Sequence, residues 1–144
     1  MLPPALPKGI CHCDFHFSSV LFKDGQFAAL IDFDNAHYTY LTYDLITLIE
    51  PFIAEFRWDT WQQFAPGQAI LDFHQPRTVT AEYIQHRALS ALEKQHLFDV
   101  YKLSILFDSI WYFERGDVND FYEKRKLDAI NAIGRKGFYQ AIFP

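Results

Sequence analysis

The stretch His12-Cys13-Asp14-Phe15-His16, followed later by Leu30-Ile31-Asp32-Phe33-Asp34, decides how this sequence is interpreted. Between the two segments lie short apolar runs separated by Asp24-Gly25, a dipeptide typical of a tight β-hairpin turn. Such a hairpin would bring its two ends together, and with them Asp14 and Asp32. Phosphoryl transfer uses a pair of acids of this kind, one to orient and deprotonate a hydroxyl and one to hold a metal that bridges the phosphates.

The chain has the length and composition of one globular domain. Of its 144 residues, 50% are hydrophobic and 22% are charged, which is enough to bury a core. A net charge of -5 disfavours nucleic acid as a partner, and the basic run at 124–126 is expected to be a solvated helix face. Nothing resembles a signal peptide or a membrane span, so we expect a cytoplasmic protein without a membrane partner.

The predicted β structure lies in the first quarter of the chain. Residues 1–8 are expected to form an extended lead-in, because they are rich in proline and show no periodicity. Residues 9–13 are predicted to be a short strand, and residues 20–23 and 26–31 to be the strands of the hairpin. The β structure is expected to end near residue 34.

The remainder is predicted to be helical. Ser90 and Glu93 form a capping-box pattern before the clearest helix, which is apolar on most of its circumference and is therefore expected to be central. Pro51 should break or kink the first helix, and Asp117 and Gly134 should begin and end the last one. The predicted helices are 42–49, 81–87, 91–113 and 118–133, with residues 57–78 ambiguous around a turn at 66–67. The expected buried face of the last helix consists of Val118, Phe121, Tyr122, Ala129, Ile130 and Ile133.

The two acidic segments resemble the catalytic segment of the aminoglycoside phosphotransferase and choline kinase superfamily. The family pattern is His-x-Asp-x-His-x-x-Asn, a hairpin, and then Ile-Asp-Phe/Trp with a further acid. Here residues 12–19 are His-Cys-Asp-Phe-His-Phe-Ser-Ser and residues 31–34 are Ile-Asp-Phe-Asp. Tyr43-Asp44-Leu45 also resembles the family's Tyr-Asp-Leu-Ala element, and residues 83–92 with the following helix resemble homoserine-kinase-type members.

The resemblance implies a fold. It is a protein-kinase-like C-terminal lobe, an α+β domain that is mainly α-helical, with a catalytic β-hairpin and a helical bundle. Residues 1–144 would be a single domain, with the catalytic loop and hairpin at 9–36 and a helical subdomain at 37–144. In the family, an N-terminal lobe grips ATP with a β-sheet, a lysine and a glutamate. Residues 1–7 are too few for that lobe, so we expect the chain to lack it.

The resemblance also implies roles for individual residues. Asp14 would be the catalytic base, and Asp32 would coordinate the Mg²⁺ that bridges the phosphates of the co-substrate ATP. His12 would support the catalytic loop, with Asp44 helping to fix it. The complete enzyme would transfer the γ-phosphate of ATP to a hydroxyl of a small molecule.

One position departs from the family pattern. Ser19 stands where the family has an asparagine that binds the nucleotide's metal, and its hydroxyl is a hard oxygen on a shorter side chain. Asp34 could compensate as a metal ligand. Because both this asparagine and the nucleotide lobe are missing, a catalytically inactive binding or regulatory module is the alternative to an enzyme.

The acceptor site is expected in the helical half. Asp108, Trp111 and Glu114 lie close together, with Tyr112, near one end of the long helix. An acidic, aromatic site suits a cationic amino alcohol, although packed aromatic residues beside solvated acids would give the same pattern. A homoserine-like acceptor and an aminoglycoside both stay open.

Two further expectations concern partners and metals. Without the N-terminal lobe, apolar residues such as Leu2, Leu6, Ile10 and Phe17 would be exposed, which predicts a homodimer or an exchanged segment. The run Cys11-His12-Cys13 could also be read as a zinc site. That alternative is disfavoured because neighbouring residues of a strand point to opposite faces. A disulfide is also disfavoured, because cysteines two residues apart on a strand rarely bridge.

Overall fold

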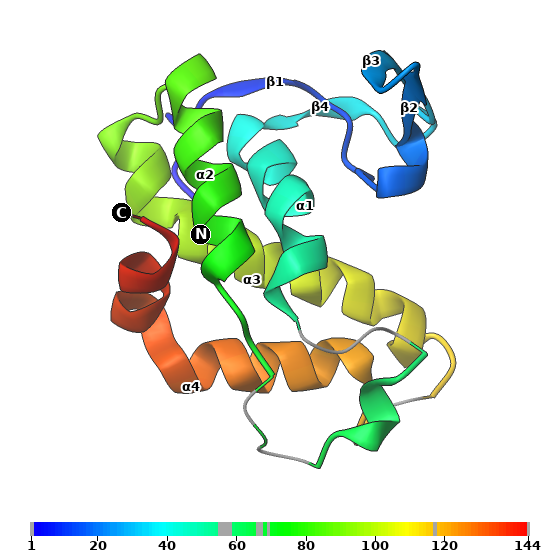
Figure 1. The fold of residues 1–144 in the computed structure, drawn as a ribbon. Helices are drawn as coiled ribbons and strands as arrows, with labels where there is room; N and C mark the ends of the chain where they lie inside the picture. Colours follow the sequence, from blue (N-terminus) through cyan, green and yellow to red (C-terminus); the bar gives the residue numbers. More distant parts are fainter. Residues whose placement is uncertain (1, 55–58, 66–67, 69, 117, 144) are drawn as a thin grey trace.

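Antiparallel β structure occupies one end of the molecule and helices form the rest (Figure 1). The computed structural model describes residues 2–54, 59–65, 68, 70–116 and 118–143. Within these residues the fold is α+β and mainly helical, as the sequence predicts. The elements are β1 (Lys8–Cys11), η1 (Phe17–Ser19), β2 (Val20–Lys23), β3 (Gln26–Leu30), β4 (His37–Tyr40), α1 (Leu41–Ile53), η2 (Trp61–Gln63), α2 (His74–His86), α3 (Ala91–Phe113) and α4 (Tyr122–Ile142), where η marks a 3₁₀ helix.

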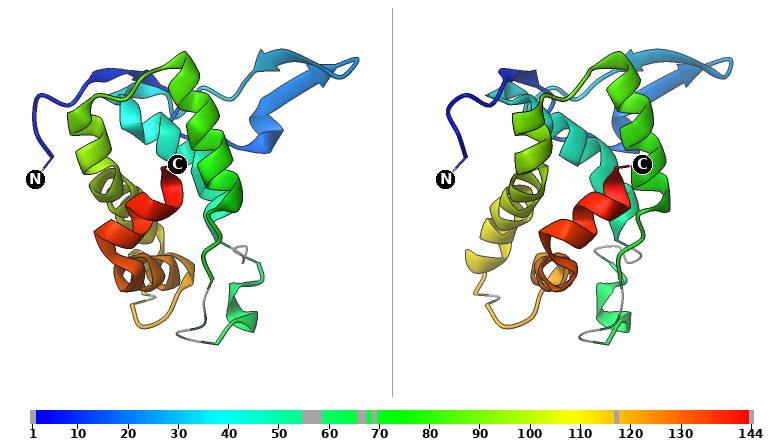
Figure 2. Two further views of the ribbon diagram at one scale, coloured as in Figure 1. Left: turned by 60° about the vertical axis from the view of Figure 1, so that its left-hand side comes forward. Right: turned by 90° about the vertical axis from the view of Figure 1, so that its left-hand side faces the viewer.

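The β2–β3 hairpin forms where it is predicted and projects from the helical body (Figure 2). Its turn residues Asp24 and Gly25 have φ angles of 51° and 73°, the left-handed backbone that a two-residue hairpin turn requires. At the other end of the hairpin, Val20 pairs with Leu30. The segments that precede and follow the hairpin therefore lie side by side at its base.

A second sheet corrects the expectation that β structure ends near residue 34. β4 pairs antiparallel with β1, with Lys8 opposite Tyr40 and Cys11 opposite His37. β1 ends at Cys11, so the predicted strand at 9–13 is too long at its C-terminal end. β4 is only four residues long and leads directly into α1, so its sequence contains no periodic signal. The pairing of β1 with β4 makes residues 12–36 one closed loop, which contains the β2–β3 hairpin.

α1 continues through Pro51, where we expected a break or a kink, so the helix does not break there. Proline lacks an N–H and its ring crowds the carbonyl of the residue four positions earlier, at a cost of about 3 kcal/mol. The helix persists because its last turn carries Ile53, which is fully buried like Ile49. Burying such a side chain contributes about 1.5–3 kcal/mol, so the packing of this turn offsets much of the proline's effect.

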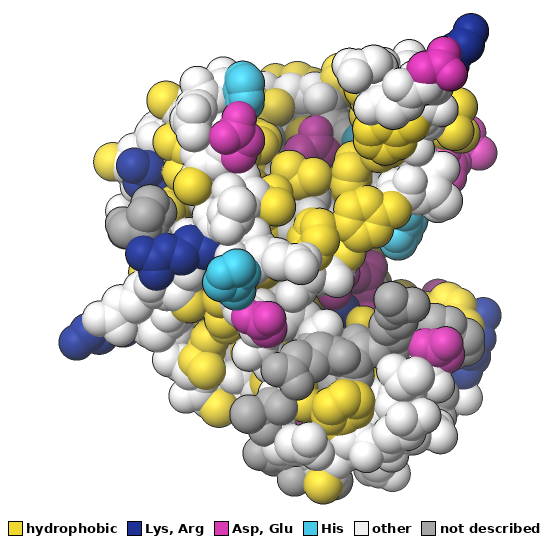
Figure 3. All heavy atoms as spheres, viewed as in Figure 1, with side chains coloured by type: hydrophobic (Ala, Val, Ile, Leu, Met, Phe, Trp, Pro, Cys, Tyr) yellow, Lys and Arg dark blue, Asp and Glu magenta, His cyan; other side chains and the backbone are white. Residues whose placement is uncertain are grey.

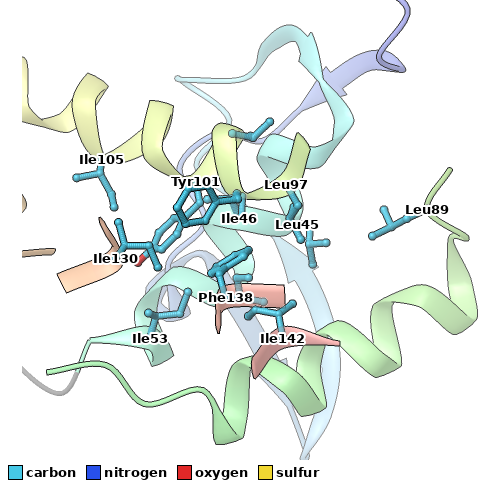
Figure 4. Packing of buried hydrophobic residues seen from close by; sticks show 13 residues of the cluster. Leu45, Ile46, Ile53, Leu89, Leu97, Tyr101, Ile105, Ile130, Phe138 and Ile142 are labelled. Atoms are coloured by element: carbon cyan, nitrogen blue, oxygen red, sulfur yellow. The ribbon is translucent and has the colours of Figure 1, made fainter. Parts of the chain in front are cut away.

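The hydrophobic core lies between α1, α3 and α4 (Figure 4). The ring of Phe138 from α4 lies between Phe98 and Tyr101 of α3, with ring centroids 5.5 and 5.8 Å apart. α3 has the predicted bounds, but it is buried on one side only. Its other side stays exposed, with Leu103 and Leu106 accessible at 46% and 44%. Among the described residues, no helix is long and apolar enough to cross a membrane.

α2 begins earlier than predicted. His74 starts the helix, and its backbone N–H donates to the Asp72 carboxylate at 2.8 Å. The sequence disfavours a helix at this position because of Pro76. This proline lies in the first turn, however, where a backbone without an N–H destabilises the helix little. The predicted turn at 66–67 lies outside the described residues.

α4 differs from its prediction at both ends. It begins at Tyr122, and the expected cap Asp117 lies outside the described residues. Gly134 interrupts the helix at the predicted position with φ 66° and ψ 174°, but a further helical segment reaches Ile142. The expected buried face is wrong for Val118 and Ile133, which are exposed, whereas Phe121 and Ile130 are buried.

The start of α3 is held by a complete capping box. The Ser90 hydroxyl accepts from the backbone of Glu93 at 3.2 Å, and the Glu93 carboxylate accepts from the backbone of Ser90 at 2.9 Å. We expect Ser90→Ala to lower the free energy of unfolding by about 1 kcal/mol, since one buried donor loses its partner. Urea denaturation measures this, with Ser18→Ala at an exposed position as the control; equal effects of the two variants would contradict the prediction.

Candidate active site

His12 joins the loop after β1 to the segment after β3. The ring is buried, and Nε2 donates to the backbone carbonyl of Ile31 at 2.9 Å. A carbonyl can only accept, so Nε2 carries the hydrogen. The ring also lies against Phe33, with centroids 4.8 Å apart. Because Ile31 directly precedes Asp32, this contact fits the expected role of His12 in supporting the loop.

The backbone is strained at both acidic segments. Of the described non-glycine residues, Cys13, Asp24 and Asp32 have positive φ. Asp24 belongs to the hairpin turn, whereas Cys13 at 66° directly precedes Asp14 and Asp32 at 68° is itself the candidate metal ligand. The Cys13 amide donates to the Asp44 carboxylate at 3.3 Å, which ties the loop to the first turn of α1. Strain that is held by such contacts is a frequent feature of functional sites.

Asp14 lies half-exposed at the meeting point of the two segments. One carboxylate oxygen is 2.8 Å from Nε2 of His16, and the other accepts from the side-chain amide of Asn35 at 2.9 Å. Asn35 comes three residues after Asp32. The structure therefore brings the Asp32 segment against Asp14, as the hairpin argument predicts. The sequence pattern did not single out Asn35, because an asparagine in a turn is ordinary.

The expected metal ligands differ in accessibility. Asp32 and Asp34 lie exposed in the turn that follows β3, and carboxylates suit Mg²⁺, which keeps several waters and needs few protein ligands. Ser19 is buried, and its hydroxyl has no hydrogen-bond partner in the described part of the chain. The exposed carboxylates therefore fit the ion, whereas the Ser19 hydroxyl is shielded from solvent.

The protonation of the two cysteines disfavours a zinc centre. Cys11 is buried, and burial together with the Asp44 carboxylate raises the pKa of its thiol to about 12. Burial also raises the pKa of Cys13. Zinc binds thiolates, so both shifts act against it. No cluster of three or more potential metal-binding side chains occurs among the described histidines, cysteines and acids.

The three residues predicted to bind the acceptor line one groove. Asp108, Trp111 and Glu114 from the end of α3 face Tyr122 and Glu123 from the start of α4 across a groove of about 640 Å³. Figure 3 shows a recess in the surface below the projecting hairpin, with acidic side chains inside it.

The groove lies within electrostatic reach of the loop that carries Asp14. Loss of solvation raises the pKa of Asp108 to about 6, although part of the residue is exposed. The charges of Lys126, Glu50 and Asp14 also act on this pKa. Tyr43 of α1 is influenced by both Asp108 and Asp14. Asp108 and Asp14 are therefore close enough for their charges to interact.

A buried lysine lies behind this groove, and the sequence did not reveal it. Lys126 is 2% exposed, so the expectation of a solvated basic face at 124–126 is wrong for this residue. Its ammonium is 2.5 Å from Glu50 of α1 and 2.6 Å from Glu123. Burial alone would lower the pKa of Lys126, but the two carboxylates raise it well above its ordinary value. The i,i+3 spacing of Glu123 and Lys126 was the available signal, yet that spacing is equally common on exposed helices.

The surface beside the site is apolar. Ile10 and Phe17 are 72% and 60% exposed, as expected, and Phe22 and Phe33 are exposed as well. Leu6 is buried, which corrects its place in that expectation, and Leu2 packs partly against the core. Exposed apolar area of this kind is unusual for an isolated domain.

Comparison with known proteins supports the family resemblance that the two acidic segments indicate. Residues 1–83 match the model of a family described as the phosphotransferase enzyme family. The chain is 37% identical over 94 residues to a homoserine kinase of Pseudomonas aeruginosa strain UCBPP-PA14, which covers 65% of this chain and 26% of the relative. The homoserine kinase of P. aeruginosa strain LESB58 is 36% identical over 94 residues, which again cover 65% of this chain and 26% of the relative. The match thus spans about a quarter of each relative's length.

Proposed function

Because this chain belongs to the phosphotransferase enzyme family, we propose that it is the catalytic, C-terminal lobe of an ATP-dependent small-molecule kinase. The supporting observation is the pair of hydrogen bonds that join its two acidic segments, from His12 to Ile31 and from Asn35 to Asp14. They hold a candidate base and a candidate metal ligand at the base of one hairpin. That arrangement is what phosphoryl transfer to a hydroxyl requires.

The residues divide the chemistry between them. Asp14 orients the acceptor hydroxyl and takes its proton as the hydroxyl oxygen bonds to the γ-phosphorus of ATP and ADP leaves. Asp32, assisted by Asp34, would hold Mg²⁺, and the ion would supply the positive charge that offsets the charge of the phosphates. His12 and Asp44 keep the loop in its strained conformation and do not contact the substrate.

The nucleotide-binding half of the reaction is proposed to come from a further lobe. The relatives are about four times longer than the matched part, and in the family that this chain resembles an N-terminal β-sheet grips ATP. We therefore expect turnover only when that lobe is present, in a cytoplasmic enzyme. A non-catalytic binding module would share the fold but would not bind the metal at Asp32.

Metal binding tests the proposal directly. Titration of Mg²⁺, with and without ATP, into ¹⁵N-labelled protein should shift the backbone amide signals of residues 31–35. Asp32→Asn should weaken this binding at least tenfold, because one carboxylate ligand is lost. Asp24→Asn, at the far end of the same hairpin, is the matched control. Equal responses of the two variants would contradict the assignment of Asp32.

The groove between α3 and α4 is proposed to bind the acceptor. It combines the carboxylates of Asp108 and Glu114 with the rings of Trp111 and Tyr122, and the charge of Asp14 acts on Asp108. A carboxylate beside aromatic faces attracts an ammonium group. The proposed substrate therefore carries a positive amine near its hydroxyl, as an amino alcohol or a homoserine-like amino acid does.

Binding of such a substrate should depend on pH through Asp108. Its ordinary pKa of 3.8 is raised to about 6, so the side chain is neutral below that pH and anionic above it. The affinity for an ammonium ligand should rise as the pH increases from about 5 to 7. Calorimetry with choline as the probe should show this rise, and Asp108→Asn should remove it. An unchanged pH dependence in the variant would assign the effect to another group.

The exposed apolar surface around Ile10 and Phe17 is proposed to be covered by a second copy when the nucleotide lobe is absent. Light scattering after size exclusion should then give a dimer mass. Ile10→Lys should shift the mass toward the monomer, whereas a wild-type monomer at low concentration would contradict the proposal.

A further inference from the structure

Asp14 is held by partners on both of its carboxylate oxygens. His16, whose side chain is 63% exposed, contacts Oδ1 at 2.8 Å, and Asn35 donates to Oδ2 at 2.9 Å. The two partners differ in how firmly they are placed. His16 belongs to the same loop and extends into solvent, so its ring can move away. Asn35 comes from the other side of the hairpin.

The backbone fixes the position of Asn35. Ala36 donates to the carbonyl of Phe33 at 2.9 Å, which closes the turn that carries Asn35. The carbonyl of Asn35 accepts from Nδ1 of His37 at 2.8 Å. His37 is the first residue of β4 and pairs with Cys11 at the end of β1. The strand that leads to Asp14 and the strand that follows Asn35 are therefore neighbours in one ladder.

We propose that Asn35 is a positioning residue for Asp14, an inference that rests on the proposed function. The carboxyl torsion of an aspartate is broad and roughly two-fold, so an unrestrained side chain aims its oxygens poorly. The amide of Asn35 fixes Oδ2, and Oδ1 then points to where an acceptor hydroxyl displaces His16. Misplacement of a reacting group by about 1 Å can slow catalysis about a hundredfold, so such restraint has a measurable value.

A simple turn role for Asn35 makes a different prediction. Aspartate and asparagine serve equally well in turns, where both accept hydrogen bonds from the backbone. Aspartate cannot donate to Asp14, however, and it adds a second negative charge beside it. Asn35→Asp therefore separates the two roles, and Asn131→Asp on the exposed face of α4 makes the same change far from the site.

The test uses two readouts. In ¹³C,¹⁵N-labelled protein, Asp14→Asn should shift the side-chain amide protons of Asn35, and Asn35→Asp, but not Asn131→Asp, should shift the Asp14 carboxyl carbon. In the complete polypeptide, Asn35→Asp should lower kcat at least tenfold with KM values changed less than threefold. It should add no further loss in an Asp14→Asn background, because a positioning residue acts only through its target.

The outcomes separate the two proposals. The positioning role is wrong if Asp14→Asn leaves the chemical shifts of the Asn35 side-chain amide unchanged. It is also wrong if the Asn35→Asp and Asn131→Asp variants have the same kcat. If wild-type protein transfers no phosphate while the Asn35 signals respond to Asp14→Asn, the proposed function fails and the placement of Asn35 stands.

Discussion

Replacing Lys126 with methionine should destabilise the protein by about 3–5 kcal/mol. Methionine has nearly the same length but no charge, so Glu50 and the buried Glu123 would lose their common partner. Burial already raises the pKa of Glu123 even with the lysine in place. Without it, each carboxylate must either stay charged in a poor environment or take up a proton. Urea denaturation measures the loss as a lower midpoint with an unchanged slope.

Two further variants make this result interpretable. Lys94→Met removes an exposed lysine from α3 and should change the stability by less than about 0.5 kcal/mol. The triple variant Lys126→Met with Glu50→Gln and Glu123→Gln removes the uncompensated charges and should recover part of the loss. If Lys126→Met resembles Lys94→Met, the buried ion pairs contribute nothing to the fold.

Asp14→Asn should lower phosphoryl transfer by about 10²–10⁴-fold in the complete polypeptide. The amide keeps the shape of the side chain but cannot take the proton of the hydroxyl. Binding of Mg²⁺ at Asp32 should remain, because Asp14 is not proposed as a metal ligand. A coupled assay of ADP release measures kcat, and the metal titration on the same sample confirms that the site is intact.

The control for this variant is Asp24→Asn, which makes the same chemical change in the hairpin turn. Asparagine is common in such turns, so this variant should keep full activity. If Asp14→Asn retained more than a tenth of the wild-type rate, the proton would have to leave by another route. Such a result would favour His16, the neighbour of Asp14, as the acceptor.

The sequence predicts those parts of the fold that depend on local signals. Asp24-Gly25 fixes the hairpin because only a left-handed turn joins two adjacent strands in this way. Ser90 and Glu93 fix the start of α3 through contacts three residues apart. The convergence of Asp14 with the Asp32 segment follows from the same hairpin.

The remaining features depend on contacts that are distant in sequence. β4 exists because it has a partner in β1, and four residues contain too little pattern to show this. Pro51 stays helical because Ile53 is buried, and Lys126 is buried because Glu50 of α1 lies opposite. The outer side of α3 is apolar like its inner side, so the sequence could not tell which side faces the core.

The β1–β4 ladder has a consequence for how the site can be lost. It closes a segment of about 25 residues, which lowers the conformational entropy of that segment. The segment regains this entropy when the ladder opens, so the loop favours opening. Opening of these two short strands would disperse the acidic residues while the buried helices stay folded. Hydrogen exchange at the β1 and β4 amides should therefore be faster than in α3, and it should report on the integrity of the site independently of global unfolding.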